Sequence, residues 1–209
     1  MPGLVLYDNP RSSNALKARF LLAELELPYE RRTVDLRRPR PEGFLALNPV
    51  GGIPALDDDG FVLSESHAIL RYLAIRESRH DLLPADLWER ARVDEFLDRF
   101  HTGIRGAFFK HEAAALGYVK GAGFGAAEPD PERAAEVAVE IRPTLDLLDS
   151  LVTADGAVLG RFTIADCALA PVLHRSIRTG LDLDPWESLA ALRDSLVTRP
   201  SFLAADPVG

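Results

Sequence analysis

The spacing of apolar residues changes once along this chain of 209 residues, near residue 85, and the change limits the folds that the chain can adopt. In the first part, a short apolar run at 4–7 is followed by a helical pattern that begins at Ser12 or Ser13. A second strand-like run follows at 31–36. A strand, a helix and a strand in this order and at these lengths predict a βαβ unit.

The second part contains long helical patterns in place of short runs. Apolar residues recur every three or four positions over 87–116 and again over 132–152, where Pro143 is expected to kink the helix. We therefore predict an α/β plus all-α fold, in which a small α/β domain over 1–80 precedes an all-helical domain over 87–209.

The segment 48–60, NPVGGIPALDDDG, is rich in residues that break regular structure. Its two prolines, two glycines and acidic turn predict a loop followed by a β-hairpin over 54–63. Pro54, at the head of the first strand, has no N–H to donate to the sheet. Either this proline simply ends a strand, or the neighbouring backbone is offered to a ligand.

The composition argues against several classes of protein. No window approaches the about 18–20 apolar residues of a membrane span, and the first residues lack the basic and apolar regions of a signal peptide. We therefore expect a cytoplasmic location. Cys167 is the single cysteine, which leaves no pair for a disulfide or a cysteine-based metal site. A net charge of −8 argues against nucleic acid and anionic membranes as partners.

Five segments, in order, resemble motifs of the cytosolic glutathione transferase family, and together they span nearly the whole chain. They are LYDNPRSSNALKARFLLAEL, similar to the first strand and helix; NPVGGIPAL, similar to the Asn-Pro-x-Gly-x-hydrophobic-Pro segment; LSESHAILRYL, similar to the Glu-Ser helix start; ARVDEFLDRFHTGIRG, similar to the long first helix of the C-terminal domain; and GRFTIADCAL, similar to the family's capping-box helix. In the last segment Thr163 and Asp166 have the spacing of a capping box, so we expect Asp166 to cap the helix.

The resemblance implies a thioredoxin-like domain followed by a helical-bundle domain, assembled as a homodimer. It also implies glutathione as the co-substrate and no metal. In this family the proline that corresponds to Pro54 follows a cis peptide bond. The backbone of the preceding residue, here Ile53, then pairs with the cysteinyl part of glutathione as a neighbouring strand would.

The chemistry implied is ionisation of the glutathione thiol, because the thiolate is the nucleophile and a free thiol has a pKa of about 8.5. A hydroxyl that donates to the sulfur near a helix N-terminus favours the thiolate. The resemblance favours Ser12 for this role, with Asn14 as a second donor and Ser13 as the alternative. One of the two serines is expected to cap the helix. Tyr7 is a further alternative, although its place in an apolar run favours a buried side chain.

The resemblance also assigns the remaining parts of glutathione. Ser66 and the helix N-terminus suit the γ-glutamyl carboxylate, and Glu65 suits the ammonium group. At the glycyl carboxylate the family often has Lys, His or Gln. Here Arg38 or Arg40 would serve, and Gly52 replaces a frequent lysine. Both arginines belong to a basic run that is otherwise typical of a solvated surface.

A second substrate, apolar and electrophilic, is expected between the domains, in contact with Phe100, His101, Arg105 and Phe108 of the long helix. We predict from this a glutathione transferase that adds glutathione to the electrophile. The alternatives are isomerisation, β-ether cleavage or disulfide reduction at the same site, and a non-catalytic glutathione-transferase-like binding protein.

Overall fold

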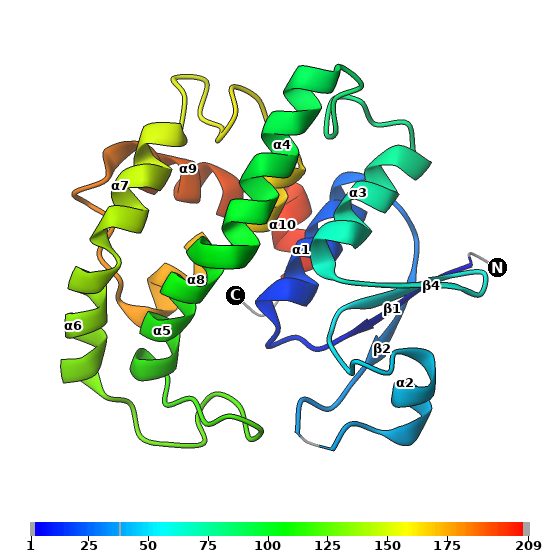
Figure 1. The fold of residues 1–209 in the computed structure, drawn as a ribbon, viewed down its shortest axis with the longest axis horizontal. Helices are drawn as coiled ribbons and strands as arrows, with labels where there is room; N and C mark the ends of the chain where they lie inside the picture. Colours follow the sequence, from blue (N-terminus) through cyan, green and yellow to red (C-terminus); the bar gives the residue numbers. More distant parts are fainter. Residues whose placement is uncertain (1–2, 38, 207–209) are drawn as a thin grey trace.

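The computed structural model describes residues 3–37 and 39–206. Figure 1 shows two parts side by side: a sheet with its helices, drawn in blue and cyan, and a group of helices drawn mainly in green to red. This arrangement confirms the predicted thioredoxin-like N-terminal domain and helical C-terminal domain. Within the described residues, no helix combines the length and the apolar character needed to cross a membrane.

The sheet has four strands in the order β2-β1-β3-β4: β1 (Leu4–Asp8), β2 (Glu30–Thr33), β3 (Ala55–Asp58) and β4 (Phe61–Ser64). β1 pairs in parallel with β2 and antiparallel with β3, and β3 and β4 form the predicted hairpin. β2 lies at the edge, where its residues are exposed, and it is shorter than the strand predicted at 31–36.

Helices cover both faces of the sheet. α1 (Ser13–Glu24) and α3 (Ser66–Arg76) pack on one face, and α2 (Glu42–Leu47) packs on the other. Successive side chains of a strand point to opposite faces. Leu6 therefore packs with α1, whereas Tyr7 is half-buried against Phe44 of α2, with ring centroids 5.8 Å apart. The Tyr7 hydroxyl accepts a hydrogen bond from Arg32 at 3.1 Å.

The helical domain begins with one long helical segment, made of α4 (Leu87–Arg99), η1 (Phe100–Ile104) and α5 (Arg105–Ala115). It confirms the long helix predicted over 87–116 (Figure 1). The middle part, η1, is π-helical, and the N–H of Arg105 donates to the carbonyl of Phe100 five positions earlier. Such a bulge changes the face that the following residues present.

The remaining helices are α6 (Pro131–Glu140), α7 (Arg142–Leu151), α8 (Ile164–Thr179), α9 (Glu187–Val197) and α10 (Pro200–Ala205). The helix predicted over 132–152 is in fact two helices that are separated at Ile141. Pro143 lies in the first turn of α7, where its missing N–H has no intrahelical acceptor to lose.

α8 begins with the predicted capping box. The buried Asp166 carboxylate accepts hydrogen bonds from the N–H groups of Thr163 at 2.8 Å and Val158 at 3.0 Å. Cys167 is fully buried, and burial raises the pKa of its thiol well above the usual value. Asp166 therefore caps a helix, and Cys167 packs as a small apolar side chain.

α1 is shared by the two domains. Its outer face packs against α8 and α10, where the rings of Phe20 and Phe202 meet edge to face with centroids 5.1 Å apart. The N–H of Ile164 also donates to the carbonyl of Leu82 in the connection between the domains. The N-terminus of α1 is thereby held at the junction, where it opens to the cleft described next.

Candidate functional site

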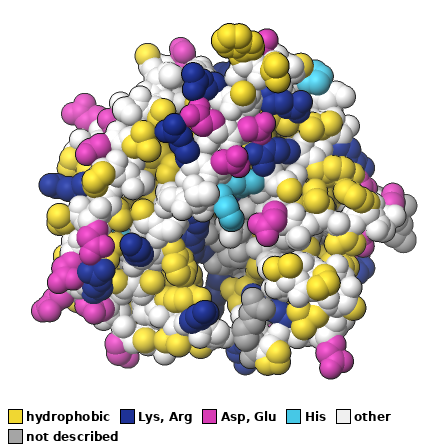
Figure 2. Space-filling model, in the orientation of Figure 1, with side chains coloured by type: hydrophobic (Ala, Val, Ile, Leu, Met, Phe, Trp, Pro, Cys, Tyr) yellow, Lys and Arg dark blue, Asp and Glu magenta, His cyan; other side chains and the backbone are white. Residues whose placement is uncertain are grey.

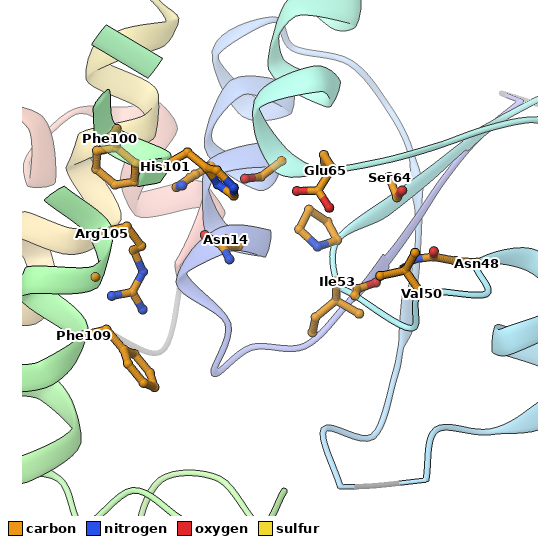
Figure 3. Close-up of a pocket in the computed structure, with 15 residues that line it drawn as sticks. Asn14, Asn48, Val50, Ile53, Ser64, Glu65, Phe100, His101, Arg105 and Phe109 are labelled. Carbon is orange, nitrogen blue, oxygen red and sulfur yellow. Dashed lines mark hydrogen bonds between the residues drawn. The ribbon is translucent and has the colours of Figure 1, made fainter. Parts of the chain in front are cut away.

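Two adjoining pockets lie in the cleft between the domains. The first has a volume of about 390 Å³ and the second of about 740 Å³, and both are lined by Asn14, Ile53, Arg105 and Phe109. Figure 2 shows the cleft as a hollow between the two domains, and Figure 3 shows residues of the first pocket that point into it from both sides. A ligand in one pocket would therefore meet a ligand in the other beside the N-terminus of α1.

The serines at the start of α1 have different partners. Ser12 is the N-cap, and its Oγ accepts a hydrogen bond from the Ala15 N–H at 3.2 Å. A hydroxyl that accepts one bond still has its own proton to donate. Ser13 is buried, and its Oγ accepts from Nη2 of Arg105 at 3.3 Å. Both serines line the second pocket, and Asn14 lines both pockets.

The loop before β3 forms one wall of the first pocket. The Ile53–Pro54 peptide bond is cis, as the resemblance implies. The Asn48 side chain is buried and donates to the Gly52 carbonyl at 2.8 Å, so it holds the loop from behind. The motifs assign Asn48 no role in the site, although it opens the Asn-Pro motif and lines the first pocket.

Arg40 supports the same loop from the other side. Its Nε donates to the Gly51 carbonyl at 3.0 Å, and its Nη1 donates to the Asp35 carbonyl at 2.6 Å. Arg40 lines the second pocket, and Gly52 lines the first. Arg38, the other arginine predicted to meet glutathione, lies outside the described residues.

The opposite wall of the first pocket is the junction of β4 and α3. Glu65 has a φ of 71°, a conformation that is uncommon outside glycine and that is concentrated at binding sites. Its exposed carboxylate points toward the pocket (Figure 3). Ser66 is the first residue of α3, and the N–H groups of a first helical turn have no intrahelical acceptor. The junction thus combines an anionic group with free N–H donors.

Lys17 also lines the first pocket, although none of the sequence motifs points to it. It is 2% exposed, and its Nζ lies 3.1 Å from Nε2 of His67 and 4.3 Å from the ring centroid of Phe100. Burial, and then repulsion from Arg105, lowers the pKa of Lys17 from 10.5 to about 7. Burial, and then the charge of Lys17, lowers the pKa of His67 to about 3. His67 is therefore neutral near pH 7.

Basic and aromatic side chains from both domains line the second pocket. The aromatic ones, Phe109, Tyr118 and Phe124, contact one another with ring centroids 4.9–5.9 Å apart. Among the described residues that line this pocket, Asp35 is the one acidic residue, whereas six are basic: Arg11, Arg37, Arg40, Arg105, Lys120 and Arg175. Such a lining suits an anion that also has an apolar part.

Glu112 is the buried partner of two of these arginines. Its carboxylate accepts hydrogen bonds from Nη2 of Arg105 at 3.1 Å and from Nη1 of Arg175 at 3.0 Å. Arg175 also donates to the Arg11 carbonyl, which ties α8 to the loop before α1. A guanidinium keeps its charge at any ordinary pH, so a buried carboxylate is required to balance it.

The residues predicted for the electrophile divide between three places. Arg105 lines both pockets, whereas Phe100 and His101 line only the first. Phe108 is buried in the core, and its neighbour Phe109 faces the cleft instead. Phe108 continues the buried row of Phe100 and Ile104, whereas Phe109 lies four positions after Arg105 on the same face of α5. The described residues contain no group of three or more His, Cys, Asp or Glu side chains arranged to hold a metal ion.

The two parts of the chain match two family models. Residues 2–75 match the glutathione S-transferase N-terminal domain, and residues 131–204 match the glutathione S-transferase C-terminal domain. Together with the relatives described next, these matches show that the chain belongs to the glutathione S-transferase family.

Known proteins resemble the chain over almost its full length. It is 32% identical to a probable maleylacetoacetate isomerase of Caenorhabditis elegans, over 97% of this chain and 92% of that protein. It is 28% identical to the glutathione S-transferase GstB of Escherichia coli K12, over 95% of each. A theta class glutathione S-transferase from Xanthomonas axonopodis pv. citri, solved with glutathione bound, has a TM-score of 0.85 and 25% identity, with 100% of this chain and 99% of that chain covered.

Proposed function

We propose that the protein binds glutathione in the first pocket, converts its thiol to a thiolate and directs the thiolate at an electrophilic carbon of a second substrate in the second pocket. The observation that carries this proposal is that the pockets meet at the N-terminus of α1. There Asn14, Ile53 and Arg105 line both pockets, and Ser12 lines the second with a hydroxyl that can donate. A glutathione sulfur held at this point would be within reach of the second substrate.

The walls of the first pocket suit the parts of glutathione in their chemical order. The γ-glutamyl end would lie at the start of α3, with its ammonium near Glu65 and its carboxylate at Ser66 and the free helix N–H groups. The backbone of Ile53 would pair with the cysteinyl part. The glycyl carboxylate would then extend past Ile53, which lines both pockets, toward Arg40 in the lining of the second. This order leaves the thiol beside Ser12.

Three features there favour the thiolate over the thiol. The Ser12 hydroxyl can donate to sulfur, the first turn of α1 presents its positive end, and the Arg105 guanidinium lies close by. Ser12 is favoured over Ser13 because Ser12 is half-buried, whereas Ser13 is buried. The Asn14 amide is a second donor.

The lining of the second pocket refines the expectation of an apolar electrophile. The aromatic cluster of Phe109, Tyr118 and Phe124 would pack on an apolar or conjugated body. The basic side chains around it would bind a carboxylate on the same molecule. We therefore infer an electrophile that combines an unsaturated body with at least one carboxylate.

Isomerisation is a second candidate, favoured by this basic lining and by the relative named maleylacetoacetate isomerase. The thiolate would add to a cis double bond conjugated with a carbonyl, forming a C–S bond while the π electron pair moves to the carbonyl oxygen. Rotation about the new single bond and return of the electron pair would expel the thiolate. The double bond is then trans, and glutathione is regenerated.

Incubation with glutathione and two electrophiles separates these candidates. One electrophile is the neutral 1-chloro-2,4-dinitrobenzene, and the other is maleylacetoacetate, with products separated by chromatography and identified by mass spectrometry. Transfer gives a glutathionyl product with release of chloride, whereas isomerisation gives a separate chromatographic peak with the mass of the substrate and leaves the amount of glutathione unchanged. Binding of S-methylglutathione without either product would contradict the proposed enzymatic function and favour a binding protein.

We also propose a homodimer in the cytoplasm. Besides the family resemblance, large apolar side chains are exposed at the ends of α3 and α4 and on β4: Phe61, Ile75, Leu87 and Trp88. Light scattering at micromolar concentration tests the assembly, and the mass of a single chain would contradict it.

A further inference from the structure

Lys17 is a buried amine that has no carboxylate partner among the residues that the structure describes. It lies on α1, one turn after Ser13, and only 2% of the residue is exposed. Within residues 3–37 and 39–206, no Asp or Glu side chain forms an ion pair with it, and its one hydrogen-bond partner is the ring of His67. Lysine is rarely buried so fully without a compensating charge. A compensating negative charge is therefore expected to reach Lys17 from outside the protein.

The side chains that contact Lys17 supply no negative charge, although the Phe100 ring favours the ammonium through a cation–π contact. From α3, His67 offers a neutral nitrogen, and the positive charge of Arg71 lies behind that ring and pairs with Asp94. From η1, Phe100 offers its ring and His101 packs edge to face on His67.

Two further charged groups act on Lys17. Arg105, at the start of α5, repels Lys17, whereas Glu65, at the start of α3, attracts it from the exposed rim. Burial and this repulsion outweigh the attraction, so the unliganded pocket favours the neutral amine at pH values above about 7.

The missing negative charge can come from a ligand, because Lys17 lines the first pocket together with Glu65 and Ser66. The pocket presents one carboxylate at its rim, and two cations, Lys17 and Arg105, deeper in. A ligand with an ammonium and a carboxylate on the same carbon complements this pattern. The γ-glutamyl end of glutathione has both groups.

We propose that Lys17 binds the carboxylate of the ligand in the first pocket and takes up a proton as the ligand binds. The inference rests on the proposed binding of glutathione in that pocket. The proton moves from solvent to the Lys17 amine, which becomes an ammonium opposite the ligand carboxylate. Lys17 is thus a binding residue that becomes charged when the ligand carboxylate is present to balance it. His67 orients the Lys17 amine.

The sign of the pH dependence follows from this step. Below pH 6 Lys17 is already charged in the free protein, so binding takes up little proton. At pH 8 about nine tenths of the free protein has neutral Lys17, so binding must bring in almost one proton per site. Affinity therefore falls about tenfold from pH 6 to pH 8 for a group that is charged in the complex throughout this range.

The test uses S-methylglutathione, which has no thiol proton to release. Its binding is measured by calorimetry in two buffers whose ionisation heats differ, phosphate and Tris at pH 8 and phosphate and MES at pH 6, so that the difference between the two heats gives the protons taken up. We expect close to one proton at pH 8 and about one tenth at pH 6. Lys17→Arg should bind with an affinity that is independent of pH over this range and with no uptake.

Two further variants complete the experiment. Lys17→Met should bind at least tenfold more weakly at pH 6 with no uptake, and Lys110→Met, at an exposed lysine of α5, should behave like the natural protein. Uptake that persists in Lys17→Arg or Lys17→Met would assign the proton to another group and overturn the inference. So would equal affinity at pH 6 and pH 8 in the natural protein. If no variant binds S-methylglutathione at millimolar concentration, the proposed function itself fails.

Discussion

The two pockets that meet at the N-terminus of α1 contain basic side chains whose charge is balanced in different ways. In the second pocket Arg105 and Arg175 share the buried carboxylate of Glu112. In the first pocket Lys17 faces a neutral imidazole and a phenyl ring. A guanidinium cannot lose its proton, so the protein must supply a counter-charge for it; an amine can lose its proton, so the protein can leave that charge to a ligand. The positive charges of the second pocket are therefore balanced by the protein before any ligand binds, whereas the charge of Lys17 in the first pocket is balanced only when a ligand binds.

The largest effect on stability is expected when the carboxylate that balances the two arginines is removed. Glu112→Gln leaves two partly buried guanidinium groups without their buried carboxylate and should lower the free energy of unfolding by about 3 kcal/mol. Urea denaturation at pH 7 measures this loss. Glu136→Gln removes an exposed ion pair with Arg133 on α6 and should leave the urea midpoint unchanged. Similar midpoints for the two variants would show that Glu112 does not balance the arginines.

The next effect tests the point where the pockets meet. Ser12→Ala should reduce kcat/KM near neutral pH by about 10–100-fold, because one charge-assisted hydrogen bond to the thiolate, worth about 1.5–3 kcal/mol, is lost. A thiolate absorbance titration of the glutathione complex should show a raised thiol pKa. S-methylglutathione should bind as before, since its sulfur has no charge.

Ser13→Ala is the matched control for this variant. If it raises the thiol pKa and Ser12→Ala does not, the two assignments exchange. Because Ser12 is the residue that caps α1, Ser12→Ala should also cost about 1 kcal/mol of stability.

A smaller effect should appear in the stability of the unliganded protein. The unfolded chain holds a proton on Lys17 up to about pH 10, whereas the folded chain loses it near pH 7. Between these values the unfolded state binds more protons, so the free energy of unfolding should rise with pH by about 1 kcal/mol per unit. Urea denaturation at pH 7.5 and 9.5 checks this. The rise should be absent in Lys17→Met, and identical slopes would contradict a neutral Lys17 in the free pocket.

The smallest effect separates the two pockets by substrate. Arg175→Met should raise KM for a carboxylate-bearing electrophile by roughly tenfold or less, equivalent to about 1.4 kcal/mol, and should leave the affinity for S-methylglutathione unchanged. Steady-state kinetics with a neutral electrophile serve as the reference, because that substrate has no carboxylate for Arg175 to meet. An equal rise in KM for both electrophiles would place Arg175 in a supporting role only.

The sequence predicts the first pocket better than the second for a physical reason. The Pro54 turn and the Glu65–Ser66 junction are local backbone features, which short motifs specify. Glu112 and Arg175 meet only after α5 and α8 have packed, so no short segment contains the pair. The sequence does give one indication of Lys17, because a lysine stands between Leu16 and Ala18, which are both buried in α1.

In the fold, too, local features are predicted better than features that depend on packing. Strand and helix periods predict both domains, and the capping box predicts the start of α8. Phe108 is expected in the cleft, but it continues the buried row of Phe100 and Ile104 at four-residue spacing. Phe109 lies four positions after Arg105, on the face of α5 that lines the cleft.

The π-helical turn over 100–104 also affects how chain length can alter the site. Each residue of an α-helix advances the chain by about 100° around the axis. A one-residue deletion within this turn would restore regular α-helix and leave α5 in about the same orientation, because the π-helical turn already accommodates one extra residue. A one-residue deletion elsewhere in α4 would instead rotate α5 by that angle, turning Arg105 and Phe109 away from Ser13. This single turn is therefore the place where the length of the helix can change without changing which side chains face the second substrate.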